Sequence, residues 1–282
     1  MRESLALRFL YGTAPGRMLL KLLVQPKVSE AAGYVLSSGA SRFLVPYYIR
    51  KHEIDMKDID IPGEGFSSFN DFFIRKRRTD GFDAARGHVI SPCDGWMSVV
   101  TIRGNTILNI KSTRYTLEDL LRDRELAEKF QGGTALVFRL TPADYHRYCY
   151  AVDGKVLLRR KIRGVLHCVR PIALRTVPVF VQNSREYQAL ETEEFGTVIQ
   201  MEIGALLVGK IKNKNTLSKG VRVNRGEEKG YFEFGGSTIL LLFRKDAIRV
   251  RRELVERKNG DGEIRVRRGD IVAETKKGKK GV

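Results

Sequence analysis

The spacing of apolar and polar residues divides the chain into two regions. In residues 1 to about 60, apolar patches such as Met18-Leu19-Leu20 and Leu22-Leu23-Val24 alternate with basic residues. This pattern is typical of amphipathic helices, which either lie on a surface or pack against the protein's own core. The pattern alone leaves both positions open.

From Ile90 onward, short β-type runs alternate with turn signals, which predicts a mostly antiparallel β region. Asp153-Gly154 is a strong hairpin signal. One helix is expected from about Thr116 to Lys129, because Thr116-Leu117-Glu118-Asp119 resembles a capping box. The predicted fold class is α+β, with a helical N-terminal region (1–60) followed by a β-rich domain (61–282).

The net charge of the chain limits the classes of partner that it is expected to bind. There are 51 Lys and Arg residues against 33 Asp and Glu, a net charge of +18, and such proteins bind nucleic acid or anionic membranes. The single tryptophan and the lack of an aromatic-basic ribonucleoprotein signature argue against sequence-specific RNA binding. No apolar run approaches the roughly 18 residues of a spanning helix, so any membrane contact is expected to be peripheral.

Cysteine and histidine usage argues against disulfides and metals. The three cysteines, Cys93, Cys149 and Cys168, are an odd number without paired spacing, which suits a reducing compartment. The four histidines do not cluster with cysteines at zinc spacing, so no metal site is expected.

The run Gly235-Gly236-Ser237-Thr238 lies between two apolar, β-prone runs. Glycine allows close approach to a backbone carbonyl, and a serine that directly follows such a carbonyl can attack it. The alternative is a glycine bulge within a buried strand, which is the commoner meaning of such a sequence.

Two further residues could activate that serine. Asp94 lies in an Asp-Gly turn directly before a predicted strand, and His146 follows a predicted strand. Together, Asp94, His146 and Ser237 are the parts of an activated nucleophile, although each alone also has a structural explanation. An α/β-hydrolase is disfavoured, because the chain lacks a Gly-x-Ser-x-Gly elbow and has the order Asp, His, Ser.

Seven segments, taken in this order, resemble the short, bacterial-type phosphatidylserine decarboxylases. They are Phe69–Arg75, Ser91–Gly95, Asp144–Tyr148, Asn183–Glu186, Glu194–Gly196, Val208-Gly209 and Gly226–Thr238. Each segment is weak evidence alone, but the ordered set is specific. The resemblance runs from about Tyr11 to the last β segment.

The resemblance implies an enzyme that makes its own cofactor. The peptide bond between Gly236 and Ser237 would break autocatalytically, giving a β chain (1–236) and an α chain (237–282). Residue 237 would become a pyruvoyl group, which serves as the electron sink in the decarboxylation of phosphatidylserine to phosphatidylethanolamine and CO2. The two chains would stay together as a heterodimer, and two such heterodimers are expected to form a homodimer.

The resemblance also implies roles for single residues. His146, oriented by Asp94, would deprotonate Ser237 and later donate the proton that completes decarboxylation. Many family members carry a second histidine where this chain has Cys149, so the acid–base chemistry would fall on His146 unless Cys149 or a water takes the place of that histidine. His167 is a second candidate, but its apolar surroundings favour a place in the core.

Substrate contacts follow from the same resemblance. Arg75, Arg185 and Lys229 are candidates for binding the headgroup phosphate and carboxylate. The N-terminal region would lie on the cytoplasmic side of the cell membrane, and no nucleic-acid partner is expected.

Two other functions remain open at this stage. The first keeps the self-cleavage but acts on another molecule with an amino-acid headgroup. The second is a non-enzymatic, basic membrane- or nucleic-acid-binding protein in which Gly235-Gly236-Ser237-Thr238 is only a bulge.

Overall fold

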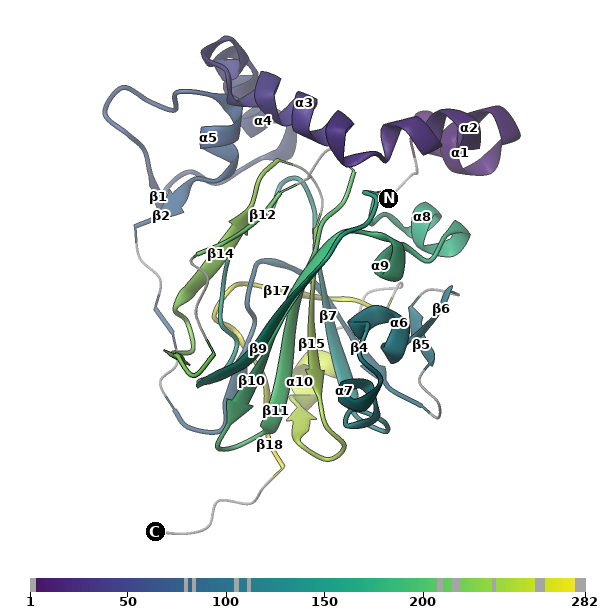
Figure 1. Ribbon diagram of the computed structural model, residues 1–282. Coiled ribbons are helices and arrows are strands. Elements are labelled where there is room, and N and C mark those ends of the chain that lie inside the picture. Colours follow the sequence, from purple (N-terminus) through teal and green to yellow (C-terminus); the bar gives the residue numbers. More distant parts are fainter. Residues whose placement is uncertain are drawn as a thin grey trace.

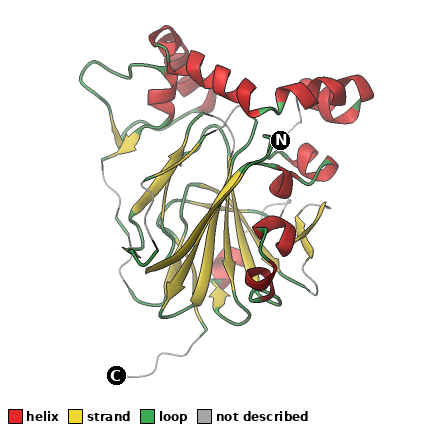
Figure 2. Cartoon of the chain, viewed as in Figure 1, coloured by secondary structure: helices red, strands yellow, loops and turns green. Residues whose placement is uncertain are grey.

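The computed structural model has a layer of N-terminal helices on an antiparallel β-rich core, which confirms the predicted fold class (Figures 1 and 2). The described residues are 4–78, 81–82, 85–103, 107–110, 113–206, 210–214, 219–234, 237–256 and 262–276. Gly235 and Gly236 therefore lie outside the described residues, and Ser237 lies within them.

Several of the N-terminal helices begin at ordinary start signals. Ser4 and Thr13 accept hydrogen bonds at the starts of the first two helices, and a proline opens the third. These helices are α1 (Leu5–Gly12), α2 (Ala14–Leu23), α3 (Pro26–Ser37), the 3-10 helix η1 (Gly39–Phe43), α4 (Leu44–His52) and α5 (Phe69–Phe73). Within the described part of the chain, no helix is long and apolar enough to span a membrane.

The single helix expected near Thr116 forms as two shorter helices. Thr116 caps the first as predicted, but Arg122 takes a left-handed conformation with φ 51° and ends it. Asp123 then caps the second helix. The later helices are α6 (Leu117–Leu121), α7 (Arg124–Glu128), α8 (Pro171–Thr176), α9 (Val179–Gln182) and α10 (Arg252–Glu256).

An eight-stranded antiparallel sheet forms the centre of the molecule, in the order β13-β9-β10-β11-β15-β7-β4-β17. Its strands are β4 (Gly95–Thr101), β7 (Thr134–Leu140), β9 (Gly154–Ile162), β10 (Arg185–Thr192), β11 (Gly196–Ile203), β13 (Arg222–Val223), β15 (Ser237–Phe243) and β17 (Ile264–Val266).

Four smaller sheets complete the fold, in the orders β12-β14-β8, β16-β18-β3, β1-β2 and β5-β6. Their strands are β1 (Ile59–Asp60), β2 (Lys76–Arg77), β3 (His88–Ile90), β5 (Ile107–Ile110), β6 (Thr113–Thr116), β8 (Arg147–Cys149), β12 (Ile211–Asn213), β14 (Glu228–Phe232), β16 (Ile248–Val250) and β18 (Ile271–Thr275).

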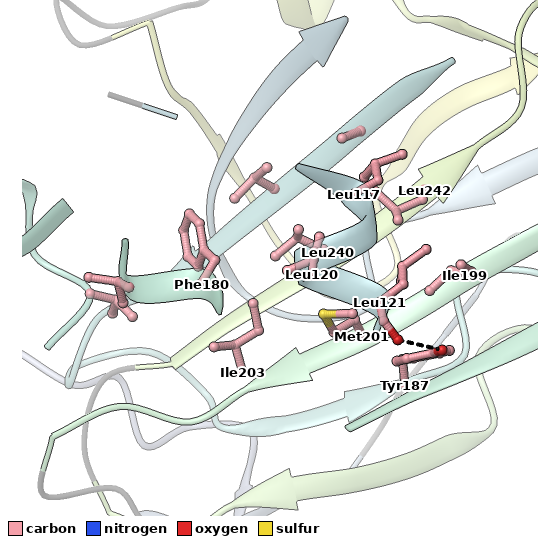
Figure 3. Packing of buried hydrophobic residues seen from close by; sticks show 14 of the residues in the cluster. Leu117, Leu120, Leu121, Phe180, Tyr187, Ile199, Met201, Ile203, Leu240 and Leu242 are labelled. Carbon is pink, nitrogen blue, oxygen red and sulfur yellow. Dashed lines mark hydrogen bonds between the residues drawn. The ribbon is translucent and has the colours of Figure 1, made fainter. Parts of the chain in front are cut away.

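The central strand β15 is buried on both sides, which explains why its sequence is almost continuously apolar. Leu240 and Leu242 point to one face, here called the helix face, where they pack with residues of α6 to α9 (Figure 3). Ile239 and Leu241 point to the other, here called the strand face, where they pack with residues of the smaller sheets. Because side chains alternate along a strand, Ser237 belongs to the strand face.

The strands of the large sheet have one end beneath the N-terminal helices (Figure 1). We call this end of the sheet, where β7 and β11 finish and β15 begins, the upper edge. Ser237 begins β15 beside Leu140, the last residue of β7, and Thr238 pairs with Ile203, the last residue of β11. Tyr11 of α1 and Tyr48 of α4 reach segments at this edge, where they bond to His167 and to the Pro142 carbonyl. The predicted nucleophile therefore lies at the boundary between the helical layer and the sheet.

Candidate active site

Three neighbouring strands bring the predicted site residues to this edge. Asp94 directly precedes β4, His146 lies six residues beyond the end of β7, and Ser237 is the first residue of β15. The strands are in direct register, because Ser237 pairs with Leu140 and Trp96 pairs with Arg139. Asp94 and His146 are 52 positions apart in the sequence, and His146 and Ser237 are 91 apart, but the strand register places all three at the same end of the sheet.

Gly95 allows β4 and β7 to approach each other at the site. It has a φ of 152°, and a Cβ atom at this position would lie 2.7 Å from the Arg139 carbonyl oxygen. A larger residue would push the two strands apart. The glycine of the predicted Asp-Gly turn therefore also sets the distance between the strands that carry Asp94 and the His146 loop.

Ser237 is fully buried, and its hydroxyl has no hydrogen-bond partner among the described residues. A buried hydroxyl without a partner costs about 1–3 kcal/mol. Thr238, on the helix face, also has an unbonded hydroxyl, so this property alone does not mark a nucleophile. The distinguishing feature of Ser237 is its position at the edge shared with Asp94 and His146.

His146 is fully buried and held from two sides. Its Nδ1 lies 2.8 Å from the Asp144 carbonyl oxygen, and its ring packs at a tilt against Phe73 with centroids 4.1 Å apart. A carbonyl only accepts hydrogen bonds, so Nδ1 carries a proton, and in the neutral ring Nε2 carries the lone pair. This tautomer is the one that a general base needs.

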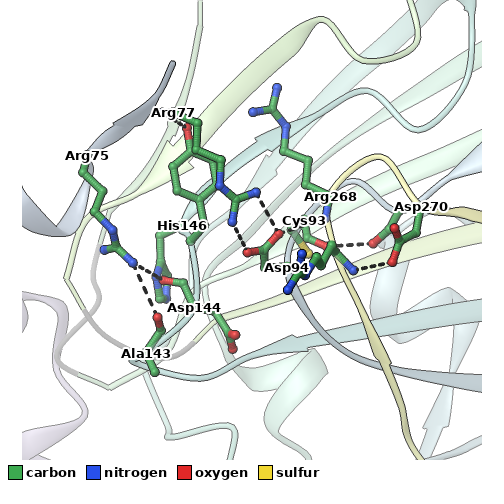
Figure 4. A network of polar contacts seen from close by, with 12 residues as sticks. Arg75, Arg77, Cys93, Asp94, Ala143, Asp144, His146, Arg268 and Asp270 are labelled. Carbon is green, nitrogen blue, oxygen red and sulfur yellow. Dashed lines mark hydrogen bonds and ion pairs between the residues drawn. The ribbon is translucent and has the colours of Figure 1, made fainter. Parts of the chain in front are cut away.

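Asp94 is held by two arginines (Figure 4). Arg77 forms an ion pair with its carboxylate, with Nη1 3.2 Å from Oδ1, and the Arg268 backbone N–H donates to Oδ1 at 2.9 Å. The orientation of His146 by Asp94 stays a prediction. Arg77 and Arg268 had not been assigned a role from the sequence, where they are two among many basic residues.

Asp144 is a second acidic residue at the site. Its carboxylate accepts hydrogen bonds from the Thr141 N–H at 2.6 Å and from Arg265 Nη2 at 2.6 Å. Burial alone would raise its pKa, but the bonds and charge of Arg265 and the bonds from Thr141 hold the pKa below the usual value. The sequence signal was present in Thr141-Pro142-Ala143-Asp144, in which the aspartate bonds back to the start of its own turn.

Of the three predicted substrate-binding residues, Arg75 lies nearest to the candidate base. Its Nη2 is 3.4 Å from the Asp144 carbonyl oxygen, the same atom that His146 contacts. The guanidinium is largely buried and stacks 5.0 Å from the Phe72 ring centroid. Burial lowers the pKa of Arg75 to about 10, so it remains a cation at neutral pH.

Arg185 lies on the helix face of the sheet, opposite to Ser237. It pairs with Ile203, and its guanidinium donates to the carbonyls of Asp119, Leu120, Val181 and Asn183 at 2.7–3.0 Å. These bonds join β10 to α6 and occupy all three guanidinium nitrogens. The geometry therefore favours a structural role for Arg185 and gives no support to substrate binding.

Lys229 lies on the strand face in a fully buried ion pair with Glu202. Burial lowers the pKa of Lys229 and raises that of Glu202. Asn213 also contacts the Glu202 carboxylate, at 3.3 Å. Because its cation is already paired, Lys229 would bind a headgroup only after leaving Glu202, so its predicted role has no support from this geometry.

The two remaining candidates occupy interior positions. Cys149 is fully buried, and its backbone N–H donates to the Pro92 carbonyl at 2.9 Å, beside the Asp94 turn. His167 lies beneath α1, with Nδ1 3.3 Å from the Tyr11 hydroxyl, and burial lowers its pKa. The expected core position of His167 is therefore found.

Comparisons with known proteins place this arrangement in a family. The family model for phosphatidylserine decarboxylase matches residues 69–274. The chain is 40% identical to phosphatidylserine decarboxylase proenzyme 2 of Clostridium acetobutylicum, covering 95% of this chain and 91% of the relative. It is 38% identical to the phosphatidylserine decarboxylase proenzyme of Ruminiclostridium cellulolyticum, covering 94% and 90%. The chain belongs to the phosphatidylserine decarboxylase family, which confirms the resemblance found in its motifs.

Proposed function

We propose that this chain is a proenzyme that cleaves itself between Gly236 and Ser237 and then decarboxylates phosphatidylserine to phosphatidylethanolamine and CO2. The similarity to phosphatidylserine decarboxylase proenzymes over nearly the whole chain supports the activity. The observation that carries the site assignment is the buried, unbonded Ser237 hydroxyl at the edge shared with Asp94 and His146.

The cleavage uses groups of the chain itself. His146 Nε2 takes the proton of the Ser237 hydroxyl, and the oxygen attacks the Gly236 carbonyl carbon. The peptide C–N bond breaks, the proton passes to the released nitrogen, and an ester replaces the amide. Loss of the Ser237 α-proton then breaks the Cβ–O bond and frees the Gly236 carboxylate. Addition of water and loss of ammonia convert residue 237 into a pyruvoyl group.

The surroundings of residue 237 fit such a group, because its buried oxygen is not committed to any described hydrogen bond. The pyruvoyl carbonyl supplies an electron sink for decarboxylation of an α-amino acid. The role of the chain is to exclude water and to hold His146, which we assign as proton donor to the product. Arg75, a buried cation beside the His146 loop, is our candidate for contact with the anionic headgroup.

The α chain would remain bound to the β chain after cleavage. Arg265 and Arg268, from the α-chain segment, bond to Asp144 and Asp94 of the β-chain segment. Glu263 adds an ion pair with Arg139 at 2.8 Å. We further propose that the processed heterodimer forms a homodimer, which light scattering with gel filtration tests, since a single-heterodimer mass would contradict it.

The N-terminal helices are our candidate membrane contact, on the cytoplasmic face of the cell membrane. Large apolar side chains are exposed on α1 to α4 and η1, namely Leu5, Phe9, Met18, Leu19, Leu22, Tyr34, Val35, Phe43 and Tyr47. Exposed basic residues lie among them, including Arg8, Arg17 and Lys21. Basic residues near an anionic surface contribute about 1 kcal/mol each, and the apolar side chains would enter the headgroup region.

Flotation with vesicles tests this contact. The double variant Met18→Asp/Leu22→Asp is expected to lose most binding to phosphatidylserine-containing vesicles, because it places charge where apolar side chains would enter. Val255→Asp, an exposed apolar residue of α10, is the matched control and should bind as the unmodified chain does. Equal binding by both variants would contradict the assignment.

Intact mass spectrometry of the purified protein tests self-cleavage. We expect fragments of residues 1–236 and 237–282, the smaller beginning with a pyruvoyl group, and we expect Ser237→Ala to remain one chain. An unmodified chain that decarboxylates without cleavage would contradict the proposal. Assays with phosphatidylserine vesicles and with soluble phosphoserine separate the lipid substrate from another amino-acid headgroup. A non-enzymatic binding protein would remain intact and release no CO2.

A further inference from the structure

Different sheets hold the two sides of the proposed cleavage site. Strand β14 ends at Phe232 and belongs to the small sheet β12-β14-β8, whereas β15 begins at Ser237 in the large sheet. The large sheet therefore fixes the nucleophile, whereas the chain up to Phe234 is held by other parts of the molecule. This inference rests on the proposed function and concerns what fixes that segment.

Phe234, two residues before Gly236, packs into a group of aromatic rings from the helical layer. Its ring centroid lies 5.0 Å from that of Phe69, 5.1 Å from Phe73 and 6.4 Å from Tyr48, with interplanar angles of 69–73°. Edge-to-face contacts of this kind are favourable and directional. We call Tyr48, Phe69 and Phe73 the ring cluster.

The backbone of Phe234 is also held. Its N–H donates to Asn70 Oδ1 of α5 at 3.4 Å. The ring and backbone of Phe234 thus both contact α5, the helix that supplies Phe69 and Phe73. A segment followed by two glycines would otherwise sample many conformations.

The ring cluster also holds the candidate base. Phe73 packs against His146 with a centroid distance of 4.1 Å, while the Phe232 N–H donates to the His146 carbonyl at 3.0 Å. Phe73 therefore contacts both Phe234 and His146. The base and Phe234 are therefore packed against the same ring.

We propose that Phe234 is a positioning residue for self-cleavage. Its ring, seated in the ring cluster, and its N–H, bonded to Asn70, fix the start of the Gly235-Gly236 pair relative to His146. This anchoring limits the positions open to the chain that leads to the Gly236 carbonyl, and small misplacement of reacting atoms strongly reduces the rate of such a reaction. Phe234 acts through the backbone and takes no part in proton transfer.

Variants at two positions test the proposal. Cleavage is followed after cell-free synthesis, as the first-order appearance of the two fragments on a denaturing gel. Phe234→Leu is expected to lower the rate about tenfold or more without shifting its pH dependence, since His146 is unaltered. Asn70→Ala should also slow cleavage, whereas Asn70→Asp keeps an acceptor oxygen and should cleave faster than Asn70→Ala.

Phe66→Leu is the matched control. Phe66 is buried in the same apolar cluster but contacts Phe72, at a centroid distance of 5.4 Å, and is not part of the ring cluster. It should lose stability while keeping the unmodified cleavage rate. Thermal unfolding of each variant, measured in the Ser237→Ala background, separates the loss of stability from the loss of rate.

The outcomes distinguish this inference from the proposed function. If the unmodified chain does not cleave between residues 236 and 237, the proposed function fails. If it cleaves and Phe234→Leu cleaves equally fast, only the positioning role fails. The positioning role also fails if Phe66→Leu and Phe234→Leu lower thermal stability equally and also slow cleavage equally.

Discussion

The two faces of the eight-stranded sheet use alternate residues of the same strands but bury different chemistry. On the helix face, Leu240 and Leu242 meet apolar residues of α6 to α9. On the strand face, Ile239 and Leu241 share the interior with polar groups. The buried polar residues of that face include Glu186, Gln188, Gln200, Glu202, Lys229 and Ser237.

The two faces contribute differently to the stability of the fold and to its chemistry. A mainly apolar face gains about 25 cal/mol for each Å² removed from water, and the Arg185 guanidinium buried on the helix face is bonded to backbone carbonyls. A polar interior is stable only where its groups find partners. On the strand face Glu202 has Lys229, while the Ser237 hydroxyl lacks a described partner. The helix face is therefore mainly a source of stability, whereas the strand face buries charged groups and the Ser237 hydroxyl at the end of the sheet where Asp94 and His146 also lie.

The largest expected effect is on the strand-face chemistry. His146→Ala removes the proposed base and should leave the chain uncleaved, whereas Cys149→Ala, three residues further along, should still cleave. The reason is that His146 Nε2 carries the lone pair, while Cys149 is packed against the Pro92 carbonyl. The two variants are compared by denaturing gel and intact mass. Loss of cleavage in Cys149→Ala would show that position 149 shares the acid–base chemistry.

The next prediction concerns the free energy of unfolding, and it compares the loss of a buried charge with the loss of a buried apolar side chain. Lys229→Met leaves Glu202 without its cation and should lower the free energy of unfolding by about 3–5 kcal/mol. The double variant Lys229→Met/Glu202→Leu should recover most of that loss, because neither charge of this pair remains buried. Leu240→Ala, on the helix face, should cost about 2–5 kcal/mol through its cavity.

Urea unfolding in the Ser237→Ala background measures these changes, since every variant is then expected to remain a single chain. If the double variant is no more stable than Lys229→Met, the unpaired charge of Glu202 is not the cause of the lost stability.

The sequence predicted the layers of this fold because their signals are local. Thr116 caps a helix as expected, and the apolar run of β15 is buried as its composition indicates. The two short helices in place of one depend on Arg122, whose left-handed conformation no propensity predicts. The family also followed from the sequence, because its motifs are specific in their order.

The contacts of the site were harder to predict, because they join distant segments. Asp94 is 174 residues from Arg268, whose backbone N–H it binds. Asp144 is 121 residues from Arg265, whose guanidinium it binds. In a chain with 51 basic residues, composition does not indicate which arginine meets which carboxylate. Arg185 shows the same limit, since only the strand register reveals that it lies on the face opposite Ser237.

The smallest effect concerns the contact between Asp144 and Arg265 at the rim of the strand face. Arg265→Met should cost only about 1 kcal/mol at neutral pH, because the Arg265 side chain is 48% exposed and solvent screens its charge. Arg252→Met, whose partner Glu256 is also on the surface, is the control and should change stability less.

The pH dependence identifies the carboxylate responsible. The pKa of Asp144 is lowered in the folded chain, so its contribution to stability is present above its unfolded pKa of about 3.9 and is lost as pH falls through the folded value. Without Arg265, only the Thr141 bonds oppose the effect of burial, so the pKa of Asp144 is lowered less and the stability lost in acid should be smaller. Urea unfolding in the Ser237→Ala background measures the free energy of unfolding with and without Arg265→Met. The difference between these two free energies should shrink in acid, where Asp144 is protonated in both chains. A difference that stays constant from neutral pH into acid would mean that Arg265 stabilises the chain through packing alone.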